Sequence, residues 1–135
     1  MGMFPGIKPP KTYEQYVVRA SIFEMLFLRR KAIETMKDAV KQPFSKKERG
    51  SGLIYLGILH AKARDLRAAA DCFREALEAA KDETFPYSAN FDIVMRTFLA
   101  IGETQVASYW LDELSKRQLY DKRFAKLAKW KKRLP

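Results

Sequence analysis

The chain has 135 residues, of which 47% are apolar, and it carries a formal net charge of +10. This length and composition fit a single domain with a packed core and exclude a mainly disordered chain. The longest apolar run is interrupted by Glu24 and followed by Arg29, Arg30 and Lys31. A membrane span needs about 20 apolar residues, so the sequence predicts no membrane-spanning helix and does not favour a membrane partner.

The N-terminus lacks the basic region followed by an apolar core that a secretion signal requires. A single cysteine, Cys72, cannot form an internal disulfide, which fits a reducing compartment. We therefore expect a soluble, cytoplasmic protein. Its charge is unevenly distributed: residues 1–49 carry 11 Lys and Arg against 5 Asp and Glu, residues 50–115 carry 6 against 10, and residues 116–135 carry 9 against 1. Two basic ends around an acidic centre favour an acidic partner over a uniform nucleic-acid coat.

Residues 1–11 are rich in proline and glycine and are predicted to be an extended, mobile leader before a single domain over 12–135. Thr12 followed by Gln15 matches a capping box, so a helix should begin near Tyr13. Helical spacing then continues until shortly before Pro43, which cannot extend a helix. No helix breaker separates the two halves of 13–42, so one long helix and a hairpin both remain open. The apolar residues at helical spacing are Tyr16, Ala20, Phe23, Phe27, Ala32, Met36, Ala39 and Val40.

Ser45 and Glu48 form a second capping box, and Ser51 is a rival start for the same helix, which should run to about Ala63. Asp65 should cap the following helix, from Leu66 to about Ala80.

Pro86 is expected at the first turn of the next helix, and Gly102 at its end. Thr104 is a candidate cap for the helix after that, and a last helix should cover about 122–132 after a turn near Gln118. The apolar faces of the first two of these helices are Phe91, Val94, Met95 and Phe98, then Ala107, Trp110, Leu111 and Leu114.

The central stretch combines small and large apolar residues at fixed spacing: Leu53, Leu56, Gly57, then Ala69, Phe73, Ala76 and Leu77. This pattern resembles a tetratricopeptide repeat, whose skeleton is W-x2-L-G-x2-Y followed by A-x3-F. Leu53 stands where Trp is usual, and His60 where Tyr is usual. The spacing also has a direct physical meaning, because small residues at Gly57, Ala69 and Ala76 let two antiparallel helices approach closely.

Ala32, Ala69 and Ala107 recur at intervals of 37 and 38 residues, slightly above the 34 residues of that family. The resemblance is best over 50–83, weaker over 88–118 and loose over 13–42, and 120–134 would be a capping helix. It implies an all-α fold: an antiparallel helix-hairpin stack in a right-handed superhelix of about three repeats with a C-terminal capping helix.

In such a stack, the resemblance implies that the first helix of each pair lines a concave groove that binds peptides or helices. The residues placed there are Ile54, Tyr55, Ile58 and Lys62 from the central unit, Asp92, Ile93, Arg96 and Leu99 from the next, and Val17, Ser21 and Glu24 from the first. The chaperone-tail binders of the family hold a carboxylate with Lys, Asn and Arg, but two of those places are Ile54 and Ile58 here. An apolar groove around Tyr55 suits an amphipathic helix or hydrophobic peptide. Alternatively, these side chains pack against the N-terminal segment or a second copy in a homo-oligomer.

The C-terminal segment is expected to be an amphipathic helix, with Tyr120, Phe124, Leu127 and Leu134 on one side. A basic stripe of Lys122, Lys126, Lys129 and Arg133 lies on the other side, with Trp130 near the border. Three interpretations compete: a solubilising cap on the last repeat, a phosphate-binding patch for RNA or DNA in which Trp130 stacks on a base, and a surface for anionic membranes or acidic proteins.

No catalytic constellation is evident, because His60 is the single histidine and neither a Cys-x-x-Cys motif nor a phosphate-cradling loop is present. The sequence therefore predicts no enzyme activity, no cofactor and no metal. It favours a non-catalytic protein-binding adaptor or chaperone-like scaffold that holds a peptide or amphipathic helix of a partner. The alternatives are a nucleic-acid-binding protein that uses the basic C-terminal helix, and a structural subunit of a homo-oligomer.

Overall fold

The computed structural model describes residues 8–134, which form helices and no strand, so the predicted all-α class is confirmed. The predicted leader lies mostly outside the described residues, and residues 8–11 are not helical. No helix within 8–134 is long and apolar enough to cross a membrane. The helices are α1 (Tyr13–Met25), α2 (Arg29–Ala39), α3 (Lys46–Lys62), α4 (Leu66–Ala79), α5 (Asn90–Ala100), α6 (Thr104–Ser115) and the 3-10 helices η1 (Lys116–Leu119) and η2 (Lys122–Arg133).

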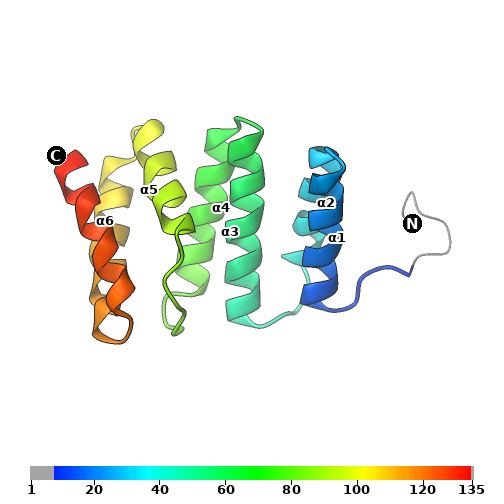
Figure 1. Cartoon of the computed structure of the whole chain (residues 1–135), viewed down its shortest axis with the longest axis horizontal. Helices are drawn as coiled ribbons and strands as arrows, with labels where there is room; N and C mark the ends of the chain where they lie inside the picture. Colours follow the sequence, from blue (N-terminus) through cyan, green and yellow to red (C-terminus); the bar gives the residue numbers. More distant parts are fainter. Residues whose placement is uncertain (1–7, 135) are drawn as a thin grey trace.

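The helices form a row in chain order, with α1 at one end and η2 at the other (Figure 1). Within the row, α1 packs against α2, α3 against α4 and α5 against α6, and each of these pairs contacts the next. Two apolar clusters fill the spaces between the helices. One joins α1, α2 and one side of α3, and the other joins α4, α5, α6 and η2. Every part of the core is therefore built between neighbours in the row.

The predicted helix starts are largely confirmed by their caps. The amide of Gln15 donates to the hydroxyl of Thr12 at 3.1 Å, and the amide of Glu48 donates to that of Ser45 at 3.1 Å. The Glu and Gln side chains complete both capping boxes. Asp65 accepts a hydrogen bond from the amide of Ala68 at 3.1 Å. The rival start at Ser51 is wrong, because Ser51 lies inside α3.

Residues 13–42 form two helices, and the break between them is at Phe27. This residue has a φ of 60°, in the left-handed region that Gly usually occupies at the end of a helix. The same turn ends α3 at Arg64, with a φ of 65°, and α5 at Gly102, with a φ of 79°. In each turn, the amide of the following residue closes a Schellman motif: Leu28 to the carbonyl of Phe23 at 2.8 Å, Asp65 to His60 at 2.9 Å, and Glu103 to Phe98 at 2.8 Å.

Two boundaries and the type of one helix differ from the prediction. Pro86 lies in the connection before α5, which begins only at Asn90, and Glu103 rather than Thr104 is the residue before α6. The C-terminal segment is not α-helical, because Lys122–Arg133 forms a 3-10 helix. At three residues per turn, every third side chain shares an edge, and this edge buries Phe124, Leu127 and Trp130. Trp130 is thus part of the core rather than a border residue, and Tyr120 is 47% exposed, with its ring centroid 5.9 Å from that of Phe124.

Candidate functional site

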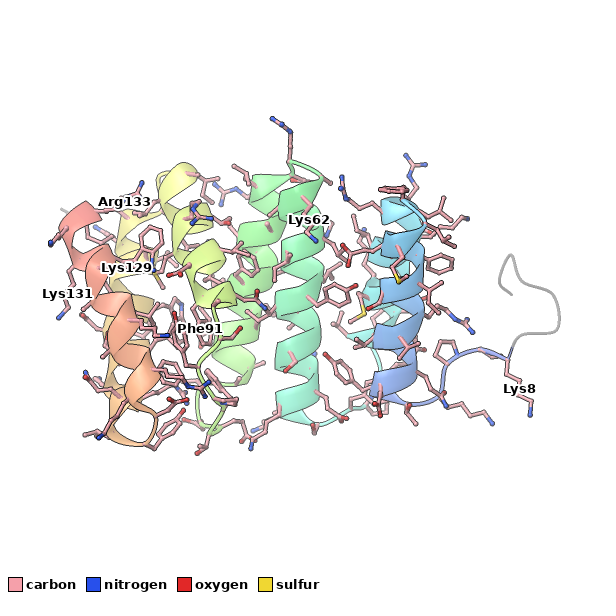
Figure 2. The ribbon with its side chains drawn as sticks, in the orientation of Figure 1. Lys8, Lys62, Phe91, Lys129, Lys131 and Arg133 are labelled. Atoms are coloured by element: carbon pink, nitrogen blue, oxygen red, sulfur yellow. The ribbon has the colours of Figure 1, made fainter. Side chains whose placement is uncertain are left out.

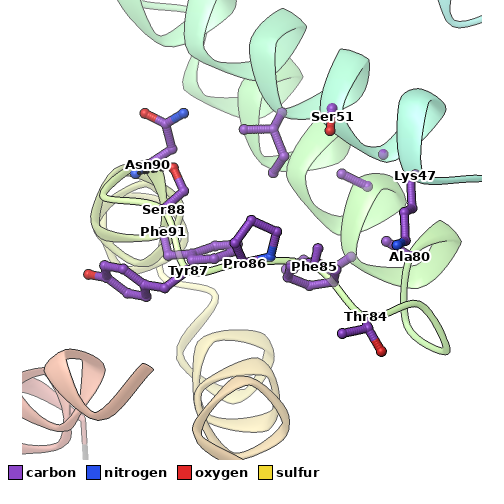
Figure 3. Close-up of a pocket in the computed structure, with 14 residues that line it drawn as sticks. Lys47, Ser51, Ala80, Thr84, Phe85, Pro86, Tyr87, Ser88, Asn90 and Phe91 are labelled. Atoms are coloured by element: carbon purple, nitrogen blue, oxygen red, sulfur yellow. Dashed lines mark hydrogen bonds between the residues drawn. The ribbon is translucent and has the colours of Figure 1, made fainter. Parts of the chain in front are cut away.

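A pocket of about 330 Å³ lies between α3, the end of α4 and the connection to α5. Figure 3 shows Lys47 and Ser51 entering it from α3, and Phe85, Pro86 and Tyr87 from the connection. The lining residues are Lys47, Gly50, Ser51, Ile54, Ala76, Leu77, Ala80, Thr84, Phe85, Pro86, Tyr87, Ser88, Asn90 and Phe91. Most of this lining is apolar, so the pocket suits an apolar side chain of a ligand.

The floor of the pocket depends on small residues where α3 meets α4. A Cβ atom added at Gly50 would lie 3.2 Å from the Cβ of Ala80, which is a tight contact. The glycine therefore allows the two helices to approach closely at this end. Ile54, one turn further along α3, packs against the cluster of α4–α6 and forms the side of the pocket.

The opposite wall is a connection without helical structure, held in place by the residues that follow α6. The guanidinium of Arg117 donates to the carbonyl oxygens of Lys81 and Glu83, at 2.7 Å each, and lies 4.1 Å from the ring centroid of Phe85. The amide of Tyr87 donates to the carboxylate of Asp121 at 3.0 Å. The hydrogen bonds of this carboxylate, first from Arg123 and then from Tyr87, hold the pKa of Asp121 well below its usual range. The wall is thus ordered by polar contacts over long sequence distances.

The predicted groove residues of α3 divide between two neighbours. Ile54 and Ile58 pack against the cluster of α4–α6, whereas Tyr55 and Lys62 turn towards α1. The hydroxyl of Tyr55 donates to Glu24 at 2.6 Å, and the ammonium of Lys62 donates to the other oxygen of that carboxylate at 3.0 Å.

These contacts on Glu24 also set its ionisation. Burial alone would raise the pKa of Glu24, but the hydrogen bonds from Tyr55 and Lys62 outweigh it and lower the pKa below the ordinary value of 4.5. Burial, and then the bond to Glu24, raise the pKa of Tyr55 to about 12. The predicted centre of the groove is therefore a polar connection between α1 and α3.

The predicted groove residues of α5 are similarly engaged. Asp92 accepts hydrogen bonds from Lys129 at 3.0 Å and from the indole of Trp130 at 2.7 Å. Burial would raise the pKa of Asp92, yet these two donors lower it. Ile93 and Leu99 pack partly against the core, and Arg96 is exposed. Asp92 thus joins α5 to η2 much as Glu24 joins α1 to α3.

The basic C-terminal residues lie at the end of the row, where Figure 2 labels Lys129, Lys131 and Arg133. Trp130 is only 4% exposed and its indole is bonded to Asp92, so this ring is not available to stack on a base. The cations also fall into other rows than those predicted for an α-helix, because η2 has three residues per turn. One row consists of Arg123, Lys126, Lys129 and Lys132, and Lys122 and Arg133 lie outside it. Arg133 lies 5.1 Å from the ring centroid of Trp130.

Sequence reasoning missed the aromatic connection that forms one wall of the pocket. The signal was present as two aromatic residues, Phe85 and Tyr87, on either side of Pro86 in a segment interpreted only as a linker. Cys72 is half-buried, and burial, followed by Glu75 and Asp71, raises the pKa of its thiol to about 11. Such a thiol is a weak nucleophile.

No family model, curated protein or solved structure matches the chain.

Proposed function

We propose that the chain is a helical-repeat protein of the tetratricopeptide type that binds a partner protein without catalysis. Two periodicities support this proposal. The three left-handed turn residues, Phe27, Arg64 and Gly102, are separated by 37 and 38 residues. One fully buried alanine in each of α2, α4 and α6 (Ala32, Ala69 and Ala107) recurs at the same separations. A matching turn and a matching small residue in each pair are what a repeated hairpin requires.

The pocket beside Ile54 is the observation that carries the binding role. Its walls are mostly apolar, it opens to solvent, and exposed Lys47 lies at its edge. These features suit an apolar anchor residue on an extended peptide or a helix of the partner, with an acidic residue beside the anchor. Tyr55, Lys62 and Asp92 then act by positioning α1, α3, α5 and η2 rather than by touching the partner.

A photo-crosslinking amino acid at exposed Ser51 tests this function, with the same amino acid at exposed Asp71 on α4 as the matched control. We expect a discrete protein adduct at position 51 that survives nuclease treatment and is absent at position 71. Two variants should remove the adduct while helical circular dichroism is retained: Ile54→Asp, and Ser51→Trp, which fills the pocket. In both variants the crosslinking amino acid is placed at position 47, because position 51 is occupied by Trp in the second. An adduct that persists in both variants would contradict the pocket as the binding site.

A second candidate function is nucleic-acid binding through phosphate contacts, which the row of cations on η2 favours. In a 3-10 helix, residues three apart lie about 6 Å apart along one edge, so this row would present evenly spaced charges. Lys129 in this row is already paired with Asp92, and Arg123 with Asp121, so Lys126 and Lys132 are the cations of the row without an ion pair among the described residues. Affinity for a labelled oligonucleotide should then fall steeply with salt and be lost in Lys126→Glu/Lys132→Glu. Equal binding by this variant would exclude the second candidate.

A further inference from the structure

The outer side of α1 carries an apolar stripe that no other described element covers. Val18, Ile22, Met25 and Leu26 are 52%, 48%, 77% and 55% exposed, respectively. Their spacing of four, three and one residues places them on one face of the helix, here called the α1 end face. Surfaces of this kind mark interaction sites, because folded proteins seldom expose contiguous large apolar side chains.

The two ends of the row of helices differ in how they are covered. At the C-terminal end, η2 covers α5 and α6 and buries Phe124, Leu127 and Trp130 (Figure 1). At the α1 end, a hollow of about 600 Å³ lies against the helix instead, with Val18, Ile22 and Leu26 in its lining. Within residues 8–134, one end of the core is therefore closed by a helix and the other is open.

The register of α1 indicates what kind of element fits there. Val18 and Ile22 precede Tyr55 and Leu59 of α3 by 37 residues, which is the interval that separates the turns and the buried alanines of the two pairs. Tyr55 and Leu59, together with Leu56, are the α3 residues that pack in the cluster with α1 and α2. Val18 and Ile22 therefore correspond to the α3 residues that contact the preceding helix pair. The equivalent surface of α3 is covered by two helices, whereas no described helix covers the α1 end face. The element that fits is a helix with an apolar stripe.

The charges around α1 indicate what kind of helix binds there. Exposed cations lie near both ends of α1, at Lys8 and Lys11 before it and at Arg29 and Arg30 after it. A second copy would bring more positive charge to this face, since residues 1–49 carry 11 cations against 5 anions and residues 116–135 carry 9 against 1. Neither end of another copy is complementary. We propose that the α1 end face docks an amphipathic helix of another protein, whose apolar stripe is flanked by Asp and Glu.

The test uses a fluorescent designed peptide of about 20 residues, long enough to be helical in water, with a Leu stripe flanked by Glu. A second peptide keeps the Leu stripe and replaces Glu by Lys. Fluorescence anisotropy at about 0.15 M salt should show binding of the Glu peptide only. Ile22→Asp should weaken it by about tenfold or more, because a charge replaces an apolar contact, and Arg30→Glu should weaken it to a smaller extent. Ile22 is half exposed, so this variant should fold, and Val18→Ser provides a milder change at the same face.

Matched variants separate this proposal from the others. Ile54→Asp in the pocket and Lys126→Glu/Lys132→Glu on η2 should leave peptide binding unchanged, so failure here and failure of the proposed function are distinguishable. Equal binding of both peptides, or Glu-peptide binding that survives Ile22→Asp and Val18→Ser, would overturn the proposal. Three further outcomes would also overturn it: self-association in sedimentation that Ile22→Asp removes, binding to phosphatidylserine vesicles in place of the peptide, or peptide binding that appears only after deletion of residues 1–7.

Discussion

The ring of Phe73 lies against the backbone of Gly57, at a distance that no side chain at position 57 would permit. A Cβ atom built there would lie 2.6 Å from Cδ1 and 3.0 Å from Cζ of the ring. Phe73 is fully buried in α4, and Gly57 is in the middle of α3. The contact explains why a residue with poor helix propensity stands inside the longest helix of the chain.

Gly57→Ala should therefore destabilise the protein, although Ala is the better helix former. We expect a loss of about 1–3 kcal/mol from overpacking, larger than the gain of about 1 kcal/mol in helix propensity. Urea unfolding followed by circular dichroism measures this difference. In a Phe73→Leu background the same substitution should cost less, because the ring that causes the clash is absent. An equal cost in both backgrounds would show that the ring is not responsible.

Gly102→Ala isolates the backbone contribution, because no atom lies within 4 Å of the added Cβ. Its φ of 79° is left-handed, so alanine should cost about 1 kcal/mol in the free energy of unfolding. Phe27→Gly makes the opposite change at the equivalent turn and should stabilise the fold, since Phe27 is exposed and strained. Thermal unfolding of both variants checks this, and a less stable Phe27→Gly would contradict it.

Glu24 should contribute to stability in a pH-dependent manner. Its pKa is lowered from the ordinary value of 4.5 in the folded state, so the ionised form is favoured by folding. The contribution is present above pH 4.5 and disappears as the pH falls through the lowered value. Glu24→Gln should thus be less stable than the parent at pH 7, and the difference should shrink below about pH 4.5. Urea unfolding across this range tests it, with exposed Glu34→Gln as the control. A difference that stays constant with pH would contradict it.

Cys72 should react slowly with a disulfide reagent such as 5,5′-dithiobis(2-nitrobenzoic acid). Burial raises the pKa of its thiol from 9.0 to about 11, so the thiolate is scarce at pH 8. In urea, where this burial is lost, the reaction should be faster by about a hundredfold. Absorbance at constant pH measures both rates. Similar rates in the folded and unfolded protein would mean that the thiol is accessible in the native state.

Local chemistry made part of this fold predictable. Thr12 with Gln15 and Ser45 with Glu48 begin helices as expected, because capping boxes satisfy backbone amides that any helix start leaves unpaired. Gly102 ends its helix for an equally local reason. The all-α class followed from these signals together with the helical spacing of apolar residues.

The turn at Phe27 could not be predicted in this way, whereas the cap at Asp65 located the turn at Arg64. Both residues adopt a left-handed conformation that their side chains disfavour. For Phe27, only its spacing from the other two turns could have located it. The C-terminal helix was expected at about 122–132, close to where it lies, but its 3-10 geometry was missed. Helical spacing was assumed to be 3.6, whereas Phe124, Leu127 and Trp130 follow a period of three.

The candidate site was predictable only in part. Ile54 was expected in a groove and does line the pocket, but its partners Phe85 and Tyr87 come from a connection with no periodicity to interpret. Nor could the sequence indicate that Tyr55 and Asp92 would be held by Glu24 and Trp130, respectively, because these pairs are 31 and 38 residues apart.

Arg117 makes the wall of the pocket depend on the residues that follow α6. It fastens the wall of the pocket through two carbonyl groups that precede it by 34 and 36 residues. One binding partner would need this wall, and another could draw residues 117–121 away from it. The two binding events would then be negatively coupled, and each would lower the affinity of the other by the same factor. The proposed binding in the pocket is thereby thermodynamically linked to the C-terminal segment: an external contact that displaces residues 117–121 would weaken it.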